Sequence, residues 1–216
     1  MKPARQQSYL RYPLNSIFAS ERFVRVLRVL FRHGDTLGAT RIARDAGLSR
    51  YGAREALGTL VAFGVIEAVG SGKSISYRID MRHPLASAIA NLFDAETERA
   101  DAVIDAVKAA VEVPEIAGAW LYGSFARGED RVGSDLDIAI VTPIRDDHAA
   151  DLVRERLDDS SDRLRFSPSV VGFDFADAAR MSGGDPWWKN LIGEAIVMKG
   201  GRPETLISAE KSKSRG

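Results

Sequence analysis

Residues 120–141 have the sequence WLYGSFARGEDRVGSDLDIAIV, and this pattern predicts a strand, a tight turn, a loop and a second strand. Gly123 and Ser124 interrupt the first apolar run, and Asp135 and Asp137 stand where the second one begins. Successive side chains of a strand point to opposite faces, so the two aspartates are expected to share one face of the second strand.

Two neighbouring carboxylates repel each other, and a bound cation relieves that repulsion. Hard oxygen ligands of this kind suit Mg²⁺ that is held together with the phosphates of a substrate. Gly123 allows the backbone to approach a phosphate closely, and Ser124 adds a hydroxyl and an N–H donor. The segment therefore predicts a site for Mg²⁺ and a phosphate-bearing substrate. The plainer alternative is a Gly-Ser turn before an edge strand with two solvent-facing aspartates.

The glycine and serine, the ten-residue spacing and both aspartates together resemble the signature of the DNA-polymerase-β-like nucleotidyltransferase superfamily, in its minimal bacterial and archaeal branch. This resemblance implies transfer of NMP from an NTP, expected to be ATP, with two Mg²⁺ ions bound by Asp135, Asp137 and a third carboxylate. It also implies that Gly123, Ser124 and Arg127 bind the phosphates.

The third carboxylate is expected from a third strand at residues 169–175. Asp174 lies near the end of that strand and matches the place that the superfamily gives to this acid. Asp177 is the alternative, because strand ends predicted from sequence are uncertain by a few residues.

Charge divides the chain into a basic and an acidic part. Residues 1–90 contain 14 Lys and Arg against 6 Asp and Glu, a net charge of +8. Residues 91–200 contain 12 against 22, a net charge of −10. This asymmetry predicts two domains with different partners, of which the basic one is a candidate for binding nucleic acid.

The basic part predicts three helices and a β-hairpin. Ser20 is the expected N-cap of a helix at 20–32, a short helix follows at 39–46, and Ser49 is the expected N-cap of a helix that runs to 63. Residues 65–69 and 74–78 bracket Gly-Ser-Gly-Lys and predict a hairpin. Together these elements resemble a winged helix-turn-helix transcriptional regulator.

In such a domain the helix at 49–63 would read DNA. Its first turns present Arg50, Tyr51 and Arg54, which suit phosphates or guanine edges, and Lys73 at the wing tip suits a phosphate or the minor groove. A winged helix used only for dimerisation or protein contact is the alternative, and the positive charge favours DNA.

The predicted fold class is α+β, with a winged helix-turn-helix followed by a small mixed sheet with flanking helices. The expected order is an N-terminal arm at 1–19, the winged helix-turn-helix at 20–83, a linking helix at 84–112, the nucleotidyltransferase domain at 113–201 and a flexible tail at 202–216. The linking helix either contacts a second copy in a homodimer or serves only for packing.

The remaining composition is that of a globular protein without cysteine. No apolar segment typical of a signal peptide or a membrane span is present, so the cytoplasm is the expected location and no membrane partner is expected.

The expected function is a DNA-binding nucleotidyltransferase, similar in architecture to toxin–antitoxin and mobile-element regulators. The acceptor is expected to be a macromolecular hydroxyl, preferably of a partner protein, because 83 residues from 117 to 199 leave little chain to enclose a small molecule. Two alternatives remain open: a regulator whose transferase fold only senses nucleotide, and an RNA-modifying transferase.

Overall fold

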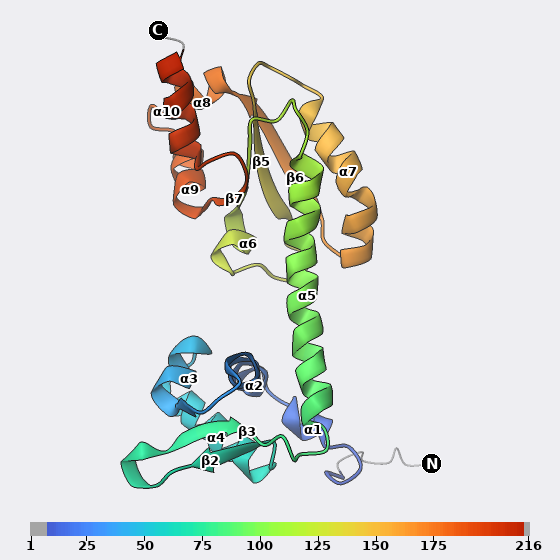
Figure 1. The fold of residues 1–216 in the computed structure, drawn as a ribbon, viewed down its shortest axis with the longest axis vertical. Helices are drawn as coiled ribbons and strands as arrows, with labels where there is room; N and C mark the ends of the chain where they lie inside the picture. The colour runs from blue at the N-terminus through green and yellow to red at the C-terminus, as the bar shows by residue number, and fades with distance from the viewer. Residues whose placement is uncertain (1–7, 214–216) are drawn as a thin grey trace. The chain divides into compact units, whose positions relative to one another are not determined.

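The structure is a computed structural model that describes residues 8–213 (Figure 1). The chain forms two compact units, Met1–Thr97 and Glu98–Gly216. Helix α5 (Ala86–Val111) begins in the first unit and ends in the second. The α+β class and the order of a helix-turn-helix before a sheet domain are confirmed.

The first unit is a three-stranded sheet with helices. Its helices and strands are α1 (Leu14–Ile17), α2 (Glu21–His33), β1 (Leu37–Gly38), α3 (Ala39–Asp45), α4 (Arg50–Ala62), β2 (Ile66–Val69), the short 3-10 helix η1 (Gly72–Ser74) and β3 (Ser76–Ile79). Strands β2 and β3 form the predicted antiparallel wing, and β1 adds an antiparallel pair with β3 that the sequence did not reveal.

The predicted capping residues set the helix ends. The Ser20 hydroxyl accepts a hydrogen bond from the Arg22 N–H at the start of α2, and Ser49 accepts one from the Gly52 N–H at the start of α4. Such an N-cap stabilises a protein by about 1 kcal/mol. Gly34 ends α2 with a φ of 72°, a conformation that favours glycine.

The predicted arm is not separate from this unit over its described part. Helix α1 places Ile17 in the core at 0% exposure. The Tyr9 hydroxyl donates a hydrogen bond to the Phe63 carbonyl at 2.6 Å, and the two rings stack. The boundary at residue 19 is therefore wrong, because apolar side chains before it bury against α4. Residues 1–7 of the arm lie outside the described part.

The second unit is built on a four-stranded mixed sheet. After α5 its elements are β4 (Gly118–Tyr122), α6 (Gly123–Arg127), β5 (Leu136–Thr142), α7 (Ala149–Leu164), β6 (Pro168–Asp174), α8 (Phe175–Met181), α9 (Pro186–Glu194), β7 (Ile196–Lys199) and α10 (Pro203–Lys213). The strand order is β6-β5-β4-β7. Strands β4 and β5 are antiparallel, β4 and β7 are antiparallel, and β5 and β6 are parallel.

Each face of this sheet packs on its own group of helices, which Figure 1 shows with α7 on one side and α9 and α10 on the other. Leu136, Ile138 and Ile140 of β5 face the C-terminal part of α5 and α7. Ala139 and Val141 face α8, α9 and α10. Asp137 lies two residues before Ala139 on the same strand and so belongs to the second face.

The flexible tail predicted for 202–216 is wrong over its described part, because Pro203–Lys213 forms α10. Ile207 is 3% exposed and packs in the core beside Trp120. A Cβ on Gly118 would lie 2.6 Å from the Leu206 side chain, so the missing side chain makes room for α10. The apolar residues of an otherwise polar segment therefore complete the sheet's second face. Residues 214–216 lie outside the described part.

Candidate functional site

The motif residues meet where β4 ends and β5 begins. Tyr122 lies directly opposite Asp137 in the antiparallel register, and Gly123 follows Tyr122 with a φ of +73°. A Cβ on Gly123 would collide with the Asp137 carboxylate and would lie 3.1 Å from its Cγ. The backbone conformation therefore favours glycine at this position, and any other residue would also displace the Asp137 carboxylate.

Asp137 is half-buried and Asp135 is exposed, because Asp135 precedes β5 and only Asp137 lies within it. Burial raises the pKa of the Asp137 carboxyl, and the negative charges of Asp135 and Glu194 raise it further, while Arg127 opposes them. Burial and the Asp137 charge also raise the pKa of Tyr122. The site thus has the like-charge crowding that the sequence predicted.

Residues 123–127, where a turn was expected, form the short helix α6. Arg127 is the last residue of this helix, and its guanidinium lies 2.8 Å from Glu129 and 2.8 Å from Glu194. Both carboxylates raise the pKa of Arg127. The Ser124 side chain forms no hydrogen bond with another described residue, so its hydroxyl is available at the site.

Glu194 is a site residue that the sequence did not indicate. It is the last residue of α9, and its Oε2 accepts a hydrogen bond from the Gly123 N–H at 2.9 Å. Its side chain is 19% exposed. Strand β7 follows immediately and pairs Ile196 with Leu121, which brings Glu194 to Gly123 across 71 residues of sequence.

The structure does not bring Asp174 to the two motif aspartates, so its predicted role as metal ligand is corrected. Asp137 lies opposite Ser169 in the parallel register, and Asp174 lies five residues further, opposite Thr142. At about 3.3 Å per residue, roughly 16 Å of strand separates them. Asp174 instead caps α8 by accepting a hydrogen bond from the Asp177 N–H at 2.7 Å.

The alternative, Asp177, lies at the same far end of the sheet and pairs with Arg180 at 2.7 Å. Among residues 8–213, no three His, Asp or Glu side chains are arranged to hold a metal ion. Asp135 and Asp137 remain as a pair of carboxylates, and their mutual repulsion fits one divalent cation whose further oxygen ligands come from a bound phosphate. The predicted set of three carboxylates for two ions is not assembled.

A pocket of about 380 Å³ lies beside Asp135. It is lined by apolar residues that include Phe125 and Phe166, and by three arginines, Arg99, Arg131 and Arg165. Arg99 donates to the carbonyls at the end of α7, whereas the side chains of Arg131 and Arg165 form no ion pair with another described residue.

The predicted DNA-reading residues lie together on α4. Arg50, Tyr51 and Arg54 are all exposed, Tyr51 by 78%. Within the described part of the chain, neither Arg50 nor Arg54 forms an ion pair or a side-chain hydrogen bond, whereas Arg22 and Arg25 on α2 are paired with glutamates. Lys73 lies in η1 at the tip of the wing.

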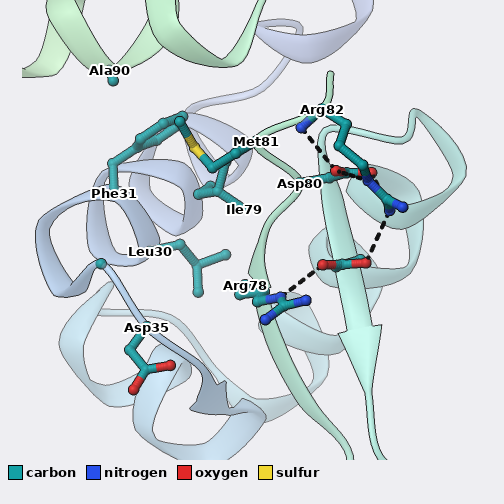
Figure 2. Close-up of a pocket in the computed structure, with 11 residues that line it drawn as sticks. Leu30, Phe31, Asp35, Arg78, Ile79, Asp80, Met81, Arg82 and Ala90 are labelled. Carbon is teal, nitrogen blue, oxygen red and sulfur yellow. Dashed lines mark hydrogen bonds and ion pairs between the residues drawn. The ribbon is translucent and has the colours of Figure 1, made fainter.

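The first unit also contains a pocket of about 640 Å³, drawn in Figure 2. Glu67 pairs with Arg78 at 2.7 Å and with Arg82 at 3.2 Å, and Arg82 pairs with Asp80 at 2.8 Å. The apolar part of the lining consists of Leu30, Phe31, Ile79, Met81 and Ala90. The paired charges neutralise one another, and none of the predicted site residues lines this pocket.

The aromatic residues near the site serve packing. Trp188 is 3% exposed, and Trp187 makes edge contacts with Tyr122 and Phe173. The Trp188 ring is too buried to stack on a base. No helix in the described part of the chain is long and apolar enough to cross a membrane.

Two family models match separate parts of the chain. The IclR helix-turn-helix domain matches residues 19–70, and the polymerase beta nucleotidyltransferase domain matches residues 105–171. No curated protein sequence matches the chain.

Solved structures with similar parts include a transcriptional repressor and a toxin–antitoxin system. The antimony-specific repressor AntR is 24% identical and covers 47% of this chain and 96% of its own, with a TM-score of 0.37. A toxin–antitoxin complex with AMP-PNP is 17% identical and covers 53% and 86%, with a TM-score of 0.33. A mutant of the pair MntA-HpeT is 14% identical, with the same coverage and a TM-score of 0.34.

The family matches agree with the geometry of both units, because the first one has a helix-turn-helix followed by a wing and the second one assembles the Gly-Ser and Asp-x-Asp motifs. The chain therefore joins an N-terminal helix-turn-helix domain to a C-terminal nucleotidyltransferase-like domain.

Proposed function

We propose that the protein is a Mg²⁺-dependent nucleotidyltransferase that transfers NMP from ATP to a hydroxyl of a partner protein, and that its first domain binds DNA and regulates transcription. The observation that carries this proposal is the contact between Gly123 and Asp137. The carboxylate fills the space that a Cβ would need, so the Gly123 backbone and the acid form one small site.

In this site Gly123, Ser124 and Arg127 would bind the phosphates, and Asp135 and Asp137 would hold Mg²⁺. The bound cation would neutralise phosphate charge and stabilise the leaving pyrophosphate. In transfer, the acceptor oxygen forms a bond to the α-phosphorus, the bond from that phosphorus to the bridging oxygen of pyrophosphate breaks, and the hydroxyl proton leaves to water.

The arginines that line the pocket beside Asp135, more than its volume, favour an acceptor that is part of a protein. Its volume of about 380 Å³ is near the lower end of the range of about 300–1,000 Å³ for small-molecule clefts. It has room for one side chain of a partner protein, and the arginines that line it would attract acidic residues near the acceptor hydroxyl.

A protein acceptor also agrees with the net charge of −10 over residues 91–200, which disfavours an RNA backbone. The combination of a DNA-binding domain, a transferase and a protein acceptor is suited to a toxin–antitoxin or mobile-element system. Contact between two copies of the chain through α5 stays a prediction.

The test is to incubate the protein with Mg²⁺, cell lysate and ATP labelled at the α-phosphate, with Asp137→Asn as the control. Label on one or a few protein bands, absent with the control, supports the proposal. Label only on RNA or only on a small metabolite contradicts the protein acceptor.

Among residues 8–213 no third acid joins Asp135 and Asp137 in a group that could hold a metal ion, which favours a second candidate, a transcriptional regulator that binds nucleotide without transferring it. Ser169 occupies the position opposite Asp137, where an acid would complete the metal site. Release of pyrophosphate from ATP separates the two functions: a sensor binds ATP and releases none.

A further inference from the structure

Glu194 contacts two groups, the Gly123 N–H and the Arg127 guanidinium, that would bind the phosphates of the nucleotide in the proposed function. Its Oε2 accepts the Gly123 N–H at 2.9 Å, and its Oε1 lies 2.8 Å from the Arg127 guanidinium. A carboxylate that accepts from a backbone N–H and an arginine makes the contacts that a phosphate oxygen pair would make.

The position of Glu194 is built into the fold. The residue ends α9, and β7 begins two residues later with Ile196 paired to Leu121. This register fixes the backbone of residue 194 beside Gly123, and only the side chain has to move for the two donors to become available.

The arrangement also places a negative charge where the phosphates of the substrate would lie. Glu194 is close enough to Asp137 to raise the pKa of that carboxyl. Both oxygens of the Glu194 carboxylate are held by donors, one by the Gly123 N–H and one by Arg127. Residues 8–213 also contain no group of three acids suited to a metal. Glu194 therefore resembles a competitor of phosphate more than a third metal ligand.

We propose that Glu194 is an internal competitor of the nucleotide: its carboxylate occupies the phosphate-binding groups Gly123 and Arg127 in the nucleotide-free protein and must leave them before an NTP binds. This inference rests on the proposed nucleotide site and adds its regulation. It makes Glu194 a determinant of NTP affinity, and a rotation of its side chain away from the Gly123 N–H and Arg127 would open the site.

Glu129 provides a matched control, because its carboxylate also pairs with Arg127, at 2.8 Å, but makes no contact with the Gly123 N–H. Glu129→Gln and Glu194→Gln remove the same charge from the same arginine. They differ in whether the Gly123 donor is freed from a charged acceptor.

The experiment measures binding of α,β-methylene-ATP with Mg²⁺, an analogue that cannot be transferred, and of inorganic tripolyphosphate, which has no base or ribose. Glu194→Gln is expected to tighten both by about tenfold, the effect of exchanging one charged hydrogen bond for a neutral one. Glu129→Gln is expected to change neither by more than about twofold. Glu194→Ala serves if the Gln variant does not fold, as judged by circular dichroism.

Unchanged or weaker binding by folded Glu194 variants overturns the competitor and makes Glu194 a residue that positions Arg127. Equally tighter binding of the two ligands by Glu129→Gln also overturns the proposal, because the effect would then come from the loss of any negative charge near Arg127. Absence of binding in the wild type and in all variants contradicts the proposed nucleotide site itself.

Discussion

Asp137 and Asp174 lie on neighbouring parallel strands but five residues apart in register, with Ser169 opposite Asp137 and Thr142 opposite Asp174. The two acids therefore stand toward opposite ends of the strand pair. Carboxylates separated in this way cannot share a metal ion.

The first prediction follows from this separation. Asp135→Asn or Asp137→Asn should abolish pyrophosphate release, whereas Asp174→Ala should retain it within about threefold and instead lower stability by about 1 kcal/mol, the effect of a lost N-cap. Pyrophosphate release and thermal unfolding measure the two effects. An inactive, folded Asp174→Ala protein would restore this acid to the site.

A second prediction concerns Gly123. Gly123→Ala should lose nucleotide binding, because its Cβ collides with the Asp137 carboxylate at a φ of +73°. Gly128→Ala is the control, since its φ is +67° and its Cβ would meet no atom within 4 Å. The control should lose only about 1–2 kcal/mol from the left-handed backbone and keep its nucleotide affinity. Equal nucleotide affinity in both variants would contradict a role for the Gly123 contact.

The third prediction is a pH dependence of stability. Because the folded protein raises the pKa of Asp137, ionising this carboxyl costs stability in the folded state. The cost is absent below the unfolded value of about 3.9 and appears as pH rises through the folded value. Asp137→Asn should therefore be at least as stable as the metal-free wild type at pH 7, and this advantage should vanish near pH 3.

Chemical unfolding of the two proteins across this pH range gives the comparison. A wild type that gains stability over Asp137→Asn as pH rises would show that the folded state favours the ionised carboxylate. Such a result would contradict a raised pKa of Asp137 caused by burial and by the charges of Asp135 and Glu194.

The fourth prediction concerns DNA. Arg50→Ala and Arg54→Ala should weaken binding to DNA from the protein's own promoter, and each lost phosphate contact should lower the log–log salt slope by about 0.9. Arg25→Ala removes the same charge from a guanidinium already paired with Glu21 and should leave the slope unchanged. Fluorescence anisotropy at several salt concentrations provides the slopes. Wild-type slopes in both α4 variants would remove α4 from the interface.

Features with local signals were predictable from the sequence. Ser20 and Ser49 indicate the starts of helices because their hydroxyls accept hydrogen bonds from N–H groups of the first turn. Gly123 indicates the end of β4. The position of Asp174 was predictable in principle, since a helix between two strands favours a parallel pair whose N-terminal ends adjoin. Glu194 was not predictable, because its contact with Gly123 depends on the pairing of β7 with β4 across 71 residues.

Helix α10 sets a limit on which fragments of the second unit can be expressed alone. The nucleotidyltransferase match ends at residue 171, but Trp120 donates its indole N–H to the Gly201 carbonyl and shares its core with Ile207. A fragment trimmed to the motif residues, or cut after residue 201, would expose this tryptophan face and tend to aggregate. Recombinant versions of the transferase domain should therefore retain the chain through residue 213.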